Sequence, residues 1–146
     1  MFYGQYEHTI DEKGRLIIPA KFRTPIKDNF IDRFFITRGF ERCLFVFTEQ
    51  EWRKIEEQFR KLPLTKSVAR NLARNFFSGA FESECDKQGR ILIPKRLIEY
   101  AGLKKDVAII GVSRRIEIWD KERWDEFSMK SLEEFEKSAE EIVFDF

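Results

Sequence analysis

The sequence predicts an α+β fold in which two βαββ repeats are accompanied by additional helices. The first observation is that the nine residues Asp11–Pro19 recur as Asp86–Pro94, with Asp, Gly, Arg and Pro at the same places. The second is that seven of twenty positions are identical between residues 4–23 and 79–98, which is too many for a shared turn type alone. The third is that strand-like alternation and helix-like periodicity follow each other in both halves of the chain.

The recurring nonapeptide predicts a tight turn between two strands. Asp11 and Asp86 can accept hydrogen bonds from the turn's own amides, and the glycine that follows supplies a positive φ without a Cβ penalty. A type I turn followed by a left-handed glycine fits this spacing. A turn needs Asp and Gly but has no need of Arg15 or Arg90, so an arginine in both copies indicates a function beyond the turn.

The strands on either side of each turn follow from alternating apolar and polar residues. Residues 5–10 alternate as a half-buried strand, and we expect them to pair across the turn with residues 15–18. Residues 80–85 are the corresponding strand of the second copy. Pro19 and Pro94 end the outgoing strands and open short helices, because proline is favoured at the start of a helix.

Two further strands and a tryptophan-bearing helix are expected after each short helix. The strands are predicted at residues 33–37 and 43–47 in the first half, and at 107–111 and 115–119 in the second. Thr48 and Asp120 precede the two tryptophan-bearing helices and are good N-caps. The second short helix ends at Gly102, a left-handed cap over which Leu103 folds back.

The remaining helices carry apolar stripes. Helix 49–61 is amphipathic, Pro63 ends it, and Thr65 can cap a second helix. The chain is therefore divided into a repeat at 5–47, a helical connector at 48–75, a repeat at 76–119 and an acidic C-terminal helix at 120–146. These apolar stripes are expected to be core or interface, and the best interface candidates are Trp52, Trp124 and Phe127.

The net charge of +1 conceals a split along the chain. Residues 1–120 carry 23 basic against 17 acidic side chains, whereas residues 121–146 carry 4 against 9. A basic body suits a nucleic-acid partner, although an excess of six charges is weak evidence by itself. The acidic tail is expected on the outside, away from such a partner.

The composition disfavours several other classes of protein. His8 is the single histidine, and the two cysteines, Cys43 and Cys85, fall at unrelated positions of the two repeats. The sequence therefore has no metal-ligand spacing, and we expect both thiols to be buried and reduced. Without a nucleophile elbow or a phosphate loop, we expect no enzyme, no cofactor, no metal and no small-molecule substrate. The chain has neither a membrane-spanning apolar run nor a secretion signal, so we expect it in the cytoplasm.

The residues around both turns resemble the MraZ family of transcriptional regulators. The segments that carry the resemblance are Gly4–Arg15, Phe76–Ala80 and Asp86–Pro94, and the likeness covers nearly the whole chain, weakening after about residue 130. It implies a SpoVT-AbrB-like fold in which swapped, interleaved hairpins close a small β-barrel, with the two repeats standing for the two subunits of a dimer. It further implies nucleoid association, assembly into rings, and binding to repeated DNA boxes upstream of the cell-division and cell-wall gene cluster, including the protein's own promoter.

The resemblance also implies that the Asp-x-x-x-Arg motif contacts DNA, here Asp11 with Arg15 and Asp86 with Arg90. We expect the arginines to contact DNA and the aspartates to position them, because a carboxylate that faced a phosphate would repel it. The candidate DNA-contacting residues are Arg15, Arg90, Lys13 and Lys87, the motif-positioning residues are Asp11, Asp86, Gly14 and Gly89, and the candidate phosphate contacts are Lys21, Arg23, Lys95 and Arg96. The alternative for each arginine is an exposed salt bridge to its aspartate, which is worth only about 0–1 kcal/mol.

Two other classes of function compete with DNA binding. An enzyme is disfavoured because only the recurring Glu7 and Glu82 are available as paired carboxylates, and these are more simply structural. An antitoxin-like scaffold that binds a partner protein through its C-terminal helix is the other alternative. The second arginine-bearing turn and the amphipathic tail argue against it, since such antitoxins usually have one domain of this type and a disordered tail.

Overall fold

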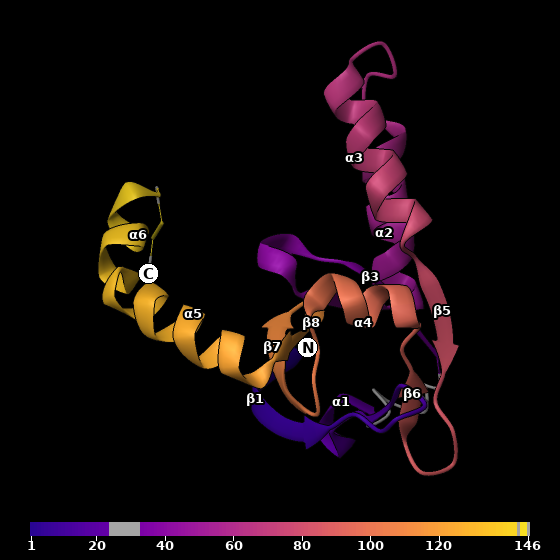
Figure 1. Cartoon of the computed structure of the whole chain (residues 1–146). Helices are drawn as coiled ribbons and strands as arrows, with labels where there is room; N and C mark the ends of the chain where they lie inside the picture. The colour runs from indigo at the N-terminus through magenta and orange to yellow at the C-terminus, as the bar shows by residue number, and fades with distance from the viewer. Residues whose placement is uncertain (24–32, 143, 146) are drawn as a thin grey trace.

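The strands of the computed structural model, which describes residues 1–23, 33–142 and 144–145, form two antiparallel sheets (Figure 1). The larger sheet has the order β1-β7-β8-β4-β3-β5 and the smaller one pairs β2 with β6. The strands of the larger sheet are β1 (Phe2–Thr9), β3 (Arg33–Arg38), β4 (Leu44–Thr48), β5 (Phe81–Glu84), β7 (Asp106–Ser113) and β8 (Arg115–Asp120). Those of the smaller sheet are β2 (Arg15–Ile17) and β6 (Arg90–Leu92).

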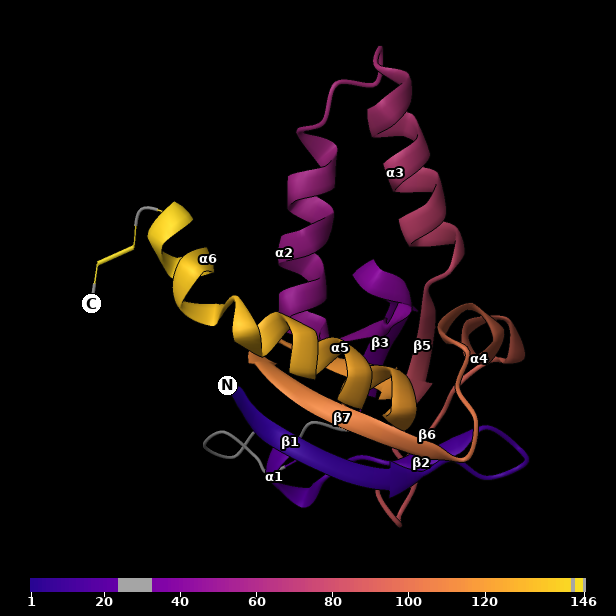
Figure 2. The ribbon, with the colours of Figure 1, turned by 60° about the vertical axis from the view of Figure 1, so that its left-hand side comes forward.

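The helices cover the ends of the larger sheet and extend beyond it. They are α1 (Ala20–Arg23), α2 (Glu49–Arg60), α3 (Ser67–Ser78), α4 (Lys95–Ala101), α5 (Lys121–Glu133) and α6 (Phe135–Glu141), with a short 3-10 turn η1 (Phe40–Arg42). Helices α2 and α3 form an antiparallel hairpin that projects from the body, and α5 and α6 form an arm that projects in another direction (Figures 1 and 2). We call these two projections the hairpin and the arm.

The strand order shows that the two repeats exchange strands. β1 comes from the first repeat but pairs with β7 of the second, and β5 of the second repeat pairs with β3 of the first. The counterparts in the two repeats are β1 and β5, β3 and β7, and β4 and β8. Exchanging each strand for its counterpart gives the same strand order read from the other edge of the sheet, so every pairing is unchanged. The sheet therefore has an internal pseudo-twofold relation, and neither repeat completes it alone.

The expected pairing of residues 5–10 with 15–18 across the turn is wrong. A single bridge between Ile10 and Leu16 joins those segments, whereas β1 pairs with β7 along its full length. β2 turns away and pairs with β6, which places Leu16 opposite Ile91 in the shared interior. Burial of these apolar side chains favours this pairing over a plain hairpin, because each fully buried aliphatic side chain stabilises the fold by about 1.5–3 kcal/mol.

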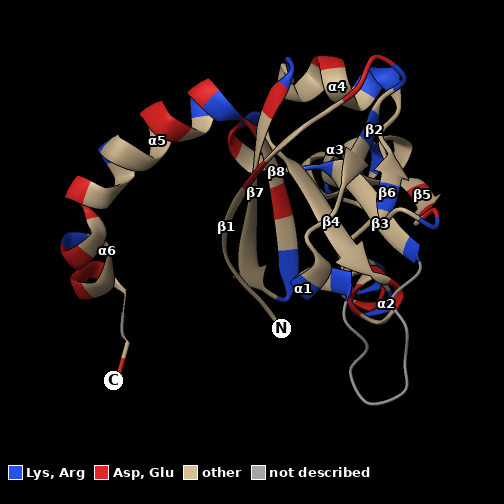
Figure 3. Cartoon of the chain, turned by 90° about the horizontal axis from the view of Figure 1, so that it is seen from below, with Lys and Arg blue, Asp and Glu red and all other residues tan. Residues whose placement is uncertain are grey.

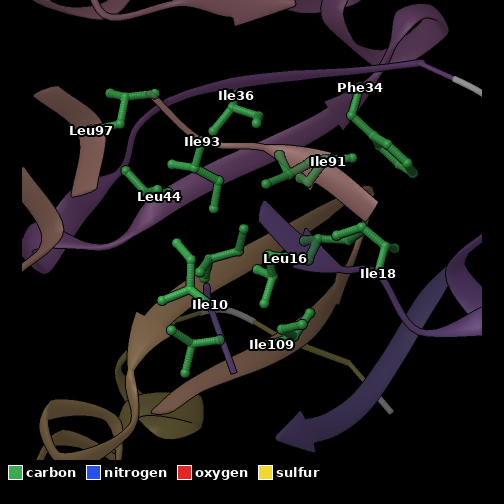
Figure 4. Close-up of a cluster of buried hydrophobic side chains, with 14 of the residues drawn as sticks. Ile10, Leu16, Ile18, Phe34, Ile36, Leu44, Ile91, Ile93, Leu97 and Ile109 are labelled. Carbon is green, nitrogen blue, oxygen red and sulfur yellow. The ribbon is translucent and has the colours of Figure 1, made fainter. Parts of the chain in front are cut away.

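The main core lies between the two sheets and draws on both repeats (Figure 4). Leu16, Ile18, Ile91 and Ile93 are each at most 1% exposed and come from the segments that follow the two turns. The smaller sheet thus caps the interior of the larger one with residues from both copies of the nonapeptide. A closed barrel stays a prediction, since the described strands fall into a six-stranded and a two-stranded sheet.

A second, aromatic cluster lies beneath the hairpin and corrects the prediction for Trp52. The Trp52 ring is stacked between the rings of Phe35 and Phe76, with centroid-to-centroid distances of 5.2 Å and 5.4 Å. The residue is only 6% exposed. It packs within its own chain and is therefore not a candidate for subunit contacts. Helical periodicity identified the apolar face of α2 but could not show that α3 covers it.

The helix ends confirm three predicted caps and correct one. Thr48 accepts a hydrogen bond from the N–H of Glu51, and Asp120 accepts one from the N–H of Arg123. Gly102 has a φ of 61°, and the N–H of Leu103 bonds back into the helix that precedes it. The predicted cap at Thr65 is wrong. α3 begins at Ser67 after a turn in which the N–H of Lys66 donates to the carbonyl of Pro63.

The acidic C-terminal segment forms two helices rather than the single one that was predicted. α5 ends at Glu133, and Glu134 has the non-helical angles φ −102° and ψ 9° before α6 begins. Neither helix contains a buried residue, so packing does not hold them in one straight rod. In the described part of the chain, no helix has the length and apolar character required to cross a membrane.

Candidate nucleic-acid interface

The two recurring motifs fold into turns of the same kind, which we call turn 1 (residues 11–15) and turn 2 (residues 86–90). In turn 1 the N–H of Gly14 donates to the carbonyl of Asp11 at 3.0 Å, and the N–H of Asp11 donates to the carbonyl of Arg15 at 3.0 Å. Gly14 has a φ of 83°, a conformation that side-chain-bearing residues rarely adopt. This geometry matches the predicted type I turn closed by a left-handed glycine.

The aspartate of turn 1 holds the arginine by both its backbone and its side chain. One carboxylate oxygen of Asp11 accepts hydrogen bonds from the N–H groups of Lys13, at 2.9 Å, and Arg15, at 2.8 Å. The other oxygen accepts from Nε of Arg15 at 2.7 Å. Because a guanidinium has five N–H donors, this bond fixes the orientation of Arg15 while Nη1 and Nη2 carry four further donors.

Turn 2 repeats this arrangement with nearly the same distances. Asp86 accepts from the N–H groups of Gln88, at 2.9 Å, and Arg90, at 2.9 Å, and from Nε of Arg90 at 2.7 Å. Gly89 has a φ of 78°. The salt bridge considered as the alternative role for each arginine is therefore present in both turns, and it leaves the arginine positioned rather than buried.

Both aspartates are held in the charged form. The backbone N–H of Arg15, followed by the guanidinium of the same residue, lowers the pKa of Asp11 below its ordinary value of 3.8. The N–H and guanidinium of Arg90 lower the pKa of Asp86 in the same way. Each turn therefore contains an ionised Asp–Arg pair at neutral pH.

The strands that follow the turns place the two arginines on one surface. Arg15 pairs with Leu92 and Arg90 pairs with Ile17, so these four residues share the outer face of the β2–β6 sheet. Leu16 lies on the opposite face, in the core. Diagonal neighbours of this kind are about 7–8 Å apart. We call this outer face, with its two turns, the ribbon face.

The other predicted residues lie around the ribbon face. Lys13 and Lys87 are exposed within turns 1 and 2, and Lys21, Lys95 and Arg96 are exposed on α1 and α4. Arg23 differs from these, because its Nε donates to the carbonyl of Ile18 at 2.8 Å and its guanidinium lies against Gly89. The structure thus brings Arg23 to turn 2 but engages it in a backbone contact. DNA contact by any of these residues stays a prediction.

Two lysines beside turn 1 were not predicted. Lys104 and Lys105 line an open concavity together with Lys13 and Lys95, and the carbonyl of Lys105 accepts a hydrogen bond from the N–H of Ile10. Lys104 also pairs with Glu122 at 3.2 Å, which raises the pKa of its ammonium. Their only sequence signal is a Lys-Lys pair just after the helix cap, and the corresponding positions of the first repeat fall within residues 24–32, outside the described residues.

The acidic arm lies away from the ribbon face. Viewed from below, β2 and β6 lie at one side of the body with α4, and α5 and α6 lie beyond the other side (Figure 3). The ribbon view in Figure 1 shows the same separation. That the tail stays away from a nucleic-acid partner remains a prediction, and Glu122 at the base of the arm pairs with Lys104 beside turn 1.

The recurring carboxylates form ion pairs, and of the two cysteines expected to be buried, Cys43 is buried whereas Cys85 is only partly buried. Glu82 forms an ion pair with Arg33 at 2.6 Å, and Glu7 forms one with Lys121 at 3.2 Å. Burial raises the pKa of the Cys43 thiol, so it stays protonated. Within the described residues, no three His, Cys, Asp or Glu side chains are grouped to hold a metal ion.

The strand exchange and the paired turns define a tandem-repeat protein in which two copies of one motif build a single arginine-bearing face. A family model described as "MraZ protein, putative antitoxin-like" matches residues 1–75 and again residues 76–145. A curated relative, the "Transcriptional regulator MraZ" of Natranaerobius thermophilus, is 53% identical over 143 residues, covering 98% of this chain and 97% of the relative. The chain belongs to the MraZ family.

Proposed function

We propose that the protein is a transcriptional regulator that binds double-stranded DNA sequence-specifically through its ribbon face. The observation that carries the proposal is the pair of Asp-oriented arginines on one two-stranded antiparallel sheet. The major groove of B-DNA admits such a two-stranded ribbon. The name of the 53% identical relative, a transcriptional regulator, supports the same function.

The distance between the two turns would let both of them contact nearby base pairs in the same groove of DNA. The carbonyl of Gly14 accepts from the N–H of Ile93, and the carbonyl of Gly89 accepts from the N–H of Ile18, so the turns lie at opposite ends of the β2–β6 sheet. Four residues of extended chain between Gly14 and Ile18 span about 13 Å. With about 3.4 Å between base pairs, this separation corresponds to roughly four base pairs.

We propose distinct roles for the residues of each turn. Arg15 and Arg90 read guanine edges, since a bidentate contact of this kind is worth about 1–3 kcal/mol of discrimination. Asp11 and Asp86 position them. The surrounding lysines contact phosphates, and each such contact steepens the dependence of log affinity on log salt by about 0.9 units.

The proposal includes the finer features that the family resemblance implies. The DNA targets are repeated boxes upstream of the cell-division and cell-wall gene cluster, including the promoter of the protein's own gene, and the protein works in the cytoplasm at the nucleoid. The two sheets form the AbrB-type barrel. The protein assembles into a homo-oligomeric ring, which multiplies the contacts made by one ribbon face when several boxes are bound together.

The test is fluorescence anisotropy with a duplex that carries repeated boxes from upstream of the protein's own gene. The variants are Arg15→Ala, Arg90→Ala and the control Arg114→Ala, each of which removes one positive charge. Arg114 follows Ser113 at the far end of β7, eight residues or about 25 Å from the end that contacts turn 1. The two turn variants are expected to lose about 5- to 150-fold in specific affinity, and the control to bind like the wild type.

Two results would overturn the proposal. Wild type could bind the duplex no better than a scrambled one, or the turn variants could bind as well as Arg114→Ala. Either result favours the antitoxin-like scaffold that the family description mentions. In that case the turns are structural and the exposed helices are the place to look for a partner protein.

A further inference from the structure

Two helices that begin in the same way have different surroundings. α2 and α5 both follow the second strand of a pseudo-equivalent pair, β4 and β8, and both place a tryptophan in the first turn. In α2, Trp52 and Phe59 are covered by α3. The centroid of the Phe59 ring lies 4.9 Å from that of Phe76 and 4.8 Å from that of Phe77. α5 has no such cover among the described residues, because α6 continues outward instead of folding back (Figure 2).

The uncovered arm exposes large apolar side chains. Met129, Leu132, Phe135 and Ile142 are 64–71% exposed, whereas Phe127 is 37% exposed and packs against Trp119 with the two ring centroids 4.9 Å apart. An isolated exposed apolar residue is ordinary, but several of them on one projecting arm mark an interaction surface.

The hairpin exposes a second apolar surface. Leu64 and Val68 are 76% and 75% exposed, Leu72 is 43% exposed, and this stripe leads from the loop before α3 along that helix toward the buried Phe76. The stripe therefore continues an aromatic cluster whose inner end is already covered by the sheet. The arm and the hairpin project in different directions, so they do not cover each other within one chain (Figure 1).

The charges of the two projections are complementary. Residues 60–75 of the hairpin carry five basic side chains and no acidic one, whereas residues 125–145 of the arm carry eight acidic and two basic side chains. Contact between two arms or between two hairpins would bring like charges together. Contact between an arm and a hairpin attracts, which steers association while the apolar residues supply the contact energy.

We infer that the arm of one molecule docks on the α3 side of the hairpin of a second copy of this chain. Apolar residues of the arm around Leu132 and Phe135 cover the stripe of Leu64, Val68 and Leu72. The contact is heterologous, since each copy offers a different surface on either side, and such contacts form a ring when the rotation between copies closes. This inference deepens the proposed homo-oligomer and does not rest on DNA binding.

The experiment measures assembly without DNA, by analytical ultracentrifugation over a range of protein concentrations. Val68→Glu damages the hairpin surface, and Leu132→Glu damages the arm, both at exposed positions that leave the fold of a single chain intact. Gln50→Glu, exposed in the first turn of α2, adds the same charge away from the stripe and serves as the control. Each damaged variant is expected to need more than about tenfold higher concentration to assemble, because each substitution replaces an apolar contact with a charged side chain that must be desolvated. The control assembles like the wild type.

Mixing the two damaged variants tests the head-to-tail arrangement directly. The Val68→Glu chain keeps an intact arm and the Leu132→Glu chain keeps an intact hairpin, so the mixture is expected to form one-to-one dimers and nothing larger. A wild type that stays monomeric overturns both the proposed oligomer and this inference. An oligomer that both variants leave unchanged overturns this inference alone, and damaged variants that remain monomeric when mixed overturn the heterologous contact.

Discussion

Turn 1 and turn 2 have nearly the same internal hydrogen bonds, but different residues lie next to them. The hydrogen bonds that each aspartate accepts from the arginine four residues later have lengths that agree to about 0.1 Å between the turns. The residues packed against the two turn glycines differ. Gly14 faces the apolar side chain of Ile98, whereas Gly89 faces the guanidinium of Arg23, and these two residues occupy equivalent positions of the two repeats. Turn 1 also contributes Lys13 to a concavity that Lys95, Lys104 and Lys105 line. A motif can thus be conserved within a chain as a local structure while its two copies offer different surroundings to a ligand.

The largest expected effect tests whether the two copies share one core equally. Leu16→Ala and Ile91→Ala remove cross-strand partners that are 0% and 1% exposed, so each is expected to lower the free energy of unfolding by about 2–5 kcal/mol. Urea denaturation measures both. Ile17→Ala, on the exposed face of the same strand, is the control and should cost less than about 1 kcal/mol. A cost below 1 kcal/mol for only one core variant would mean that the copies contribute unequally.

The next effect asks whether the surroundings make one turn the stronger DNA reader. Arg15→Lys and Arg90→Lys keep the charge but lose the forked donor and the Nε bond to aspartate, so specific affinity is expected to fall by about 5- to 150-fold. The salt dependence stays unchanged because no charge is removed. We expect the larger loss for Arg15, beside the lysines of turn 1. Equal losses in anisotropy titrations would show that those lysines are solvated charges only.

A smaller effect concerns Arg23, which packs against turn 2. Arg23→Ala is expected to lower the free energy of unfolding by about 0.5–1.5 kcal/mol, the usual value of one hydrogen bond, because it removes the contact with the Ile18 carbonyl. Arg23→Lys, which lacks the Nε donor, should lose as much and serves as the matched variant. If Arg23→Ala has the same free energy of unfolding in urea as the wild type, the stability of the fold does not depend on the contact between Arg23 and turn 2.

The smallest effect is the response of both turns to acid. The folded-state pKa of Asp11 and of Asp86 lies below 3.8, so the stability that each contributes is present above that pH and is lost as the pH falls through the folded pKa. The difference in urea midpoint between wild type and either Asp11→Asn or Asp86→Asn should therefore be constant from pH 7 to about 4.5 and shrink below about pH 4. The two variants should behave alike. A difference that shrinks between pH 7 and 5 would contradict the assigned pKa direction.

The sequence by itself determined the turns, because their hydrogen bonds lie within five consecutive residues. The spacing of Asp, Gly and Arg specified a turn, a left-handed glycine and an arginine beside the aspartate, and the structure contains all three twice. The caps at Thr48, Asp120 and Gly102 were predictable for the same reason, since a cap depends on residues three or four positions away.

Only the tertiary structure decided which segments far apart in the chain meet. Strand periodicity fixes the face of a strand but not its partner, so the pairing of β1 with β7, about a hundred residues away, could not be read from alternation. Helical periodicity likewise made Trp52 and Phe127 equal interface candidates, yet one is 6% exposed under α3 and the other is 37% exposed. Lys105 reached turn 1 through a backbone bond to Ile10, a contact that no local pattern encodes.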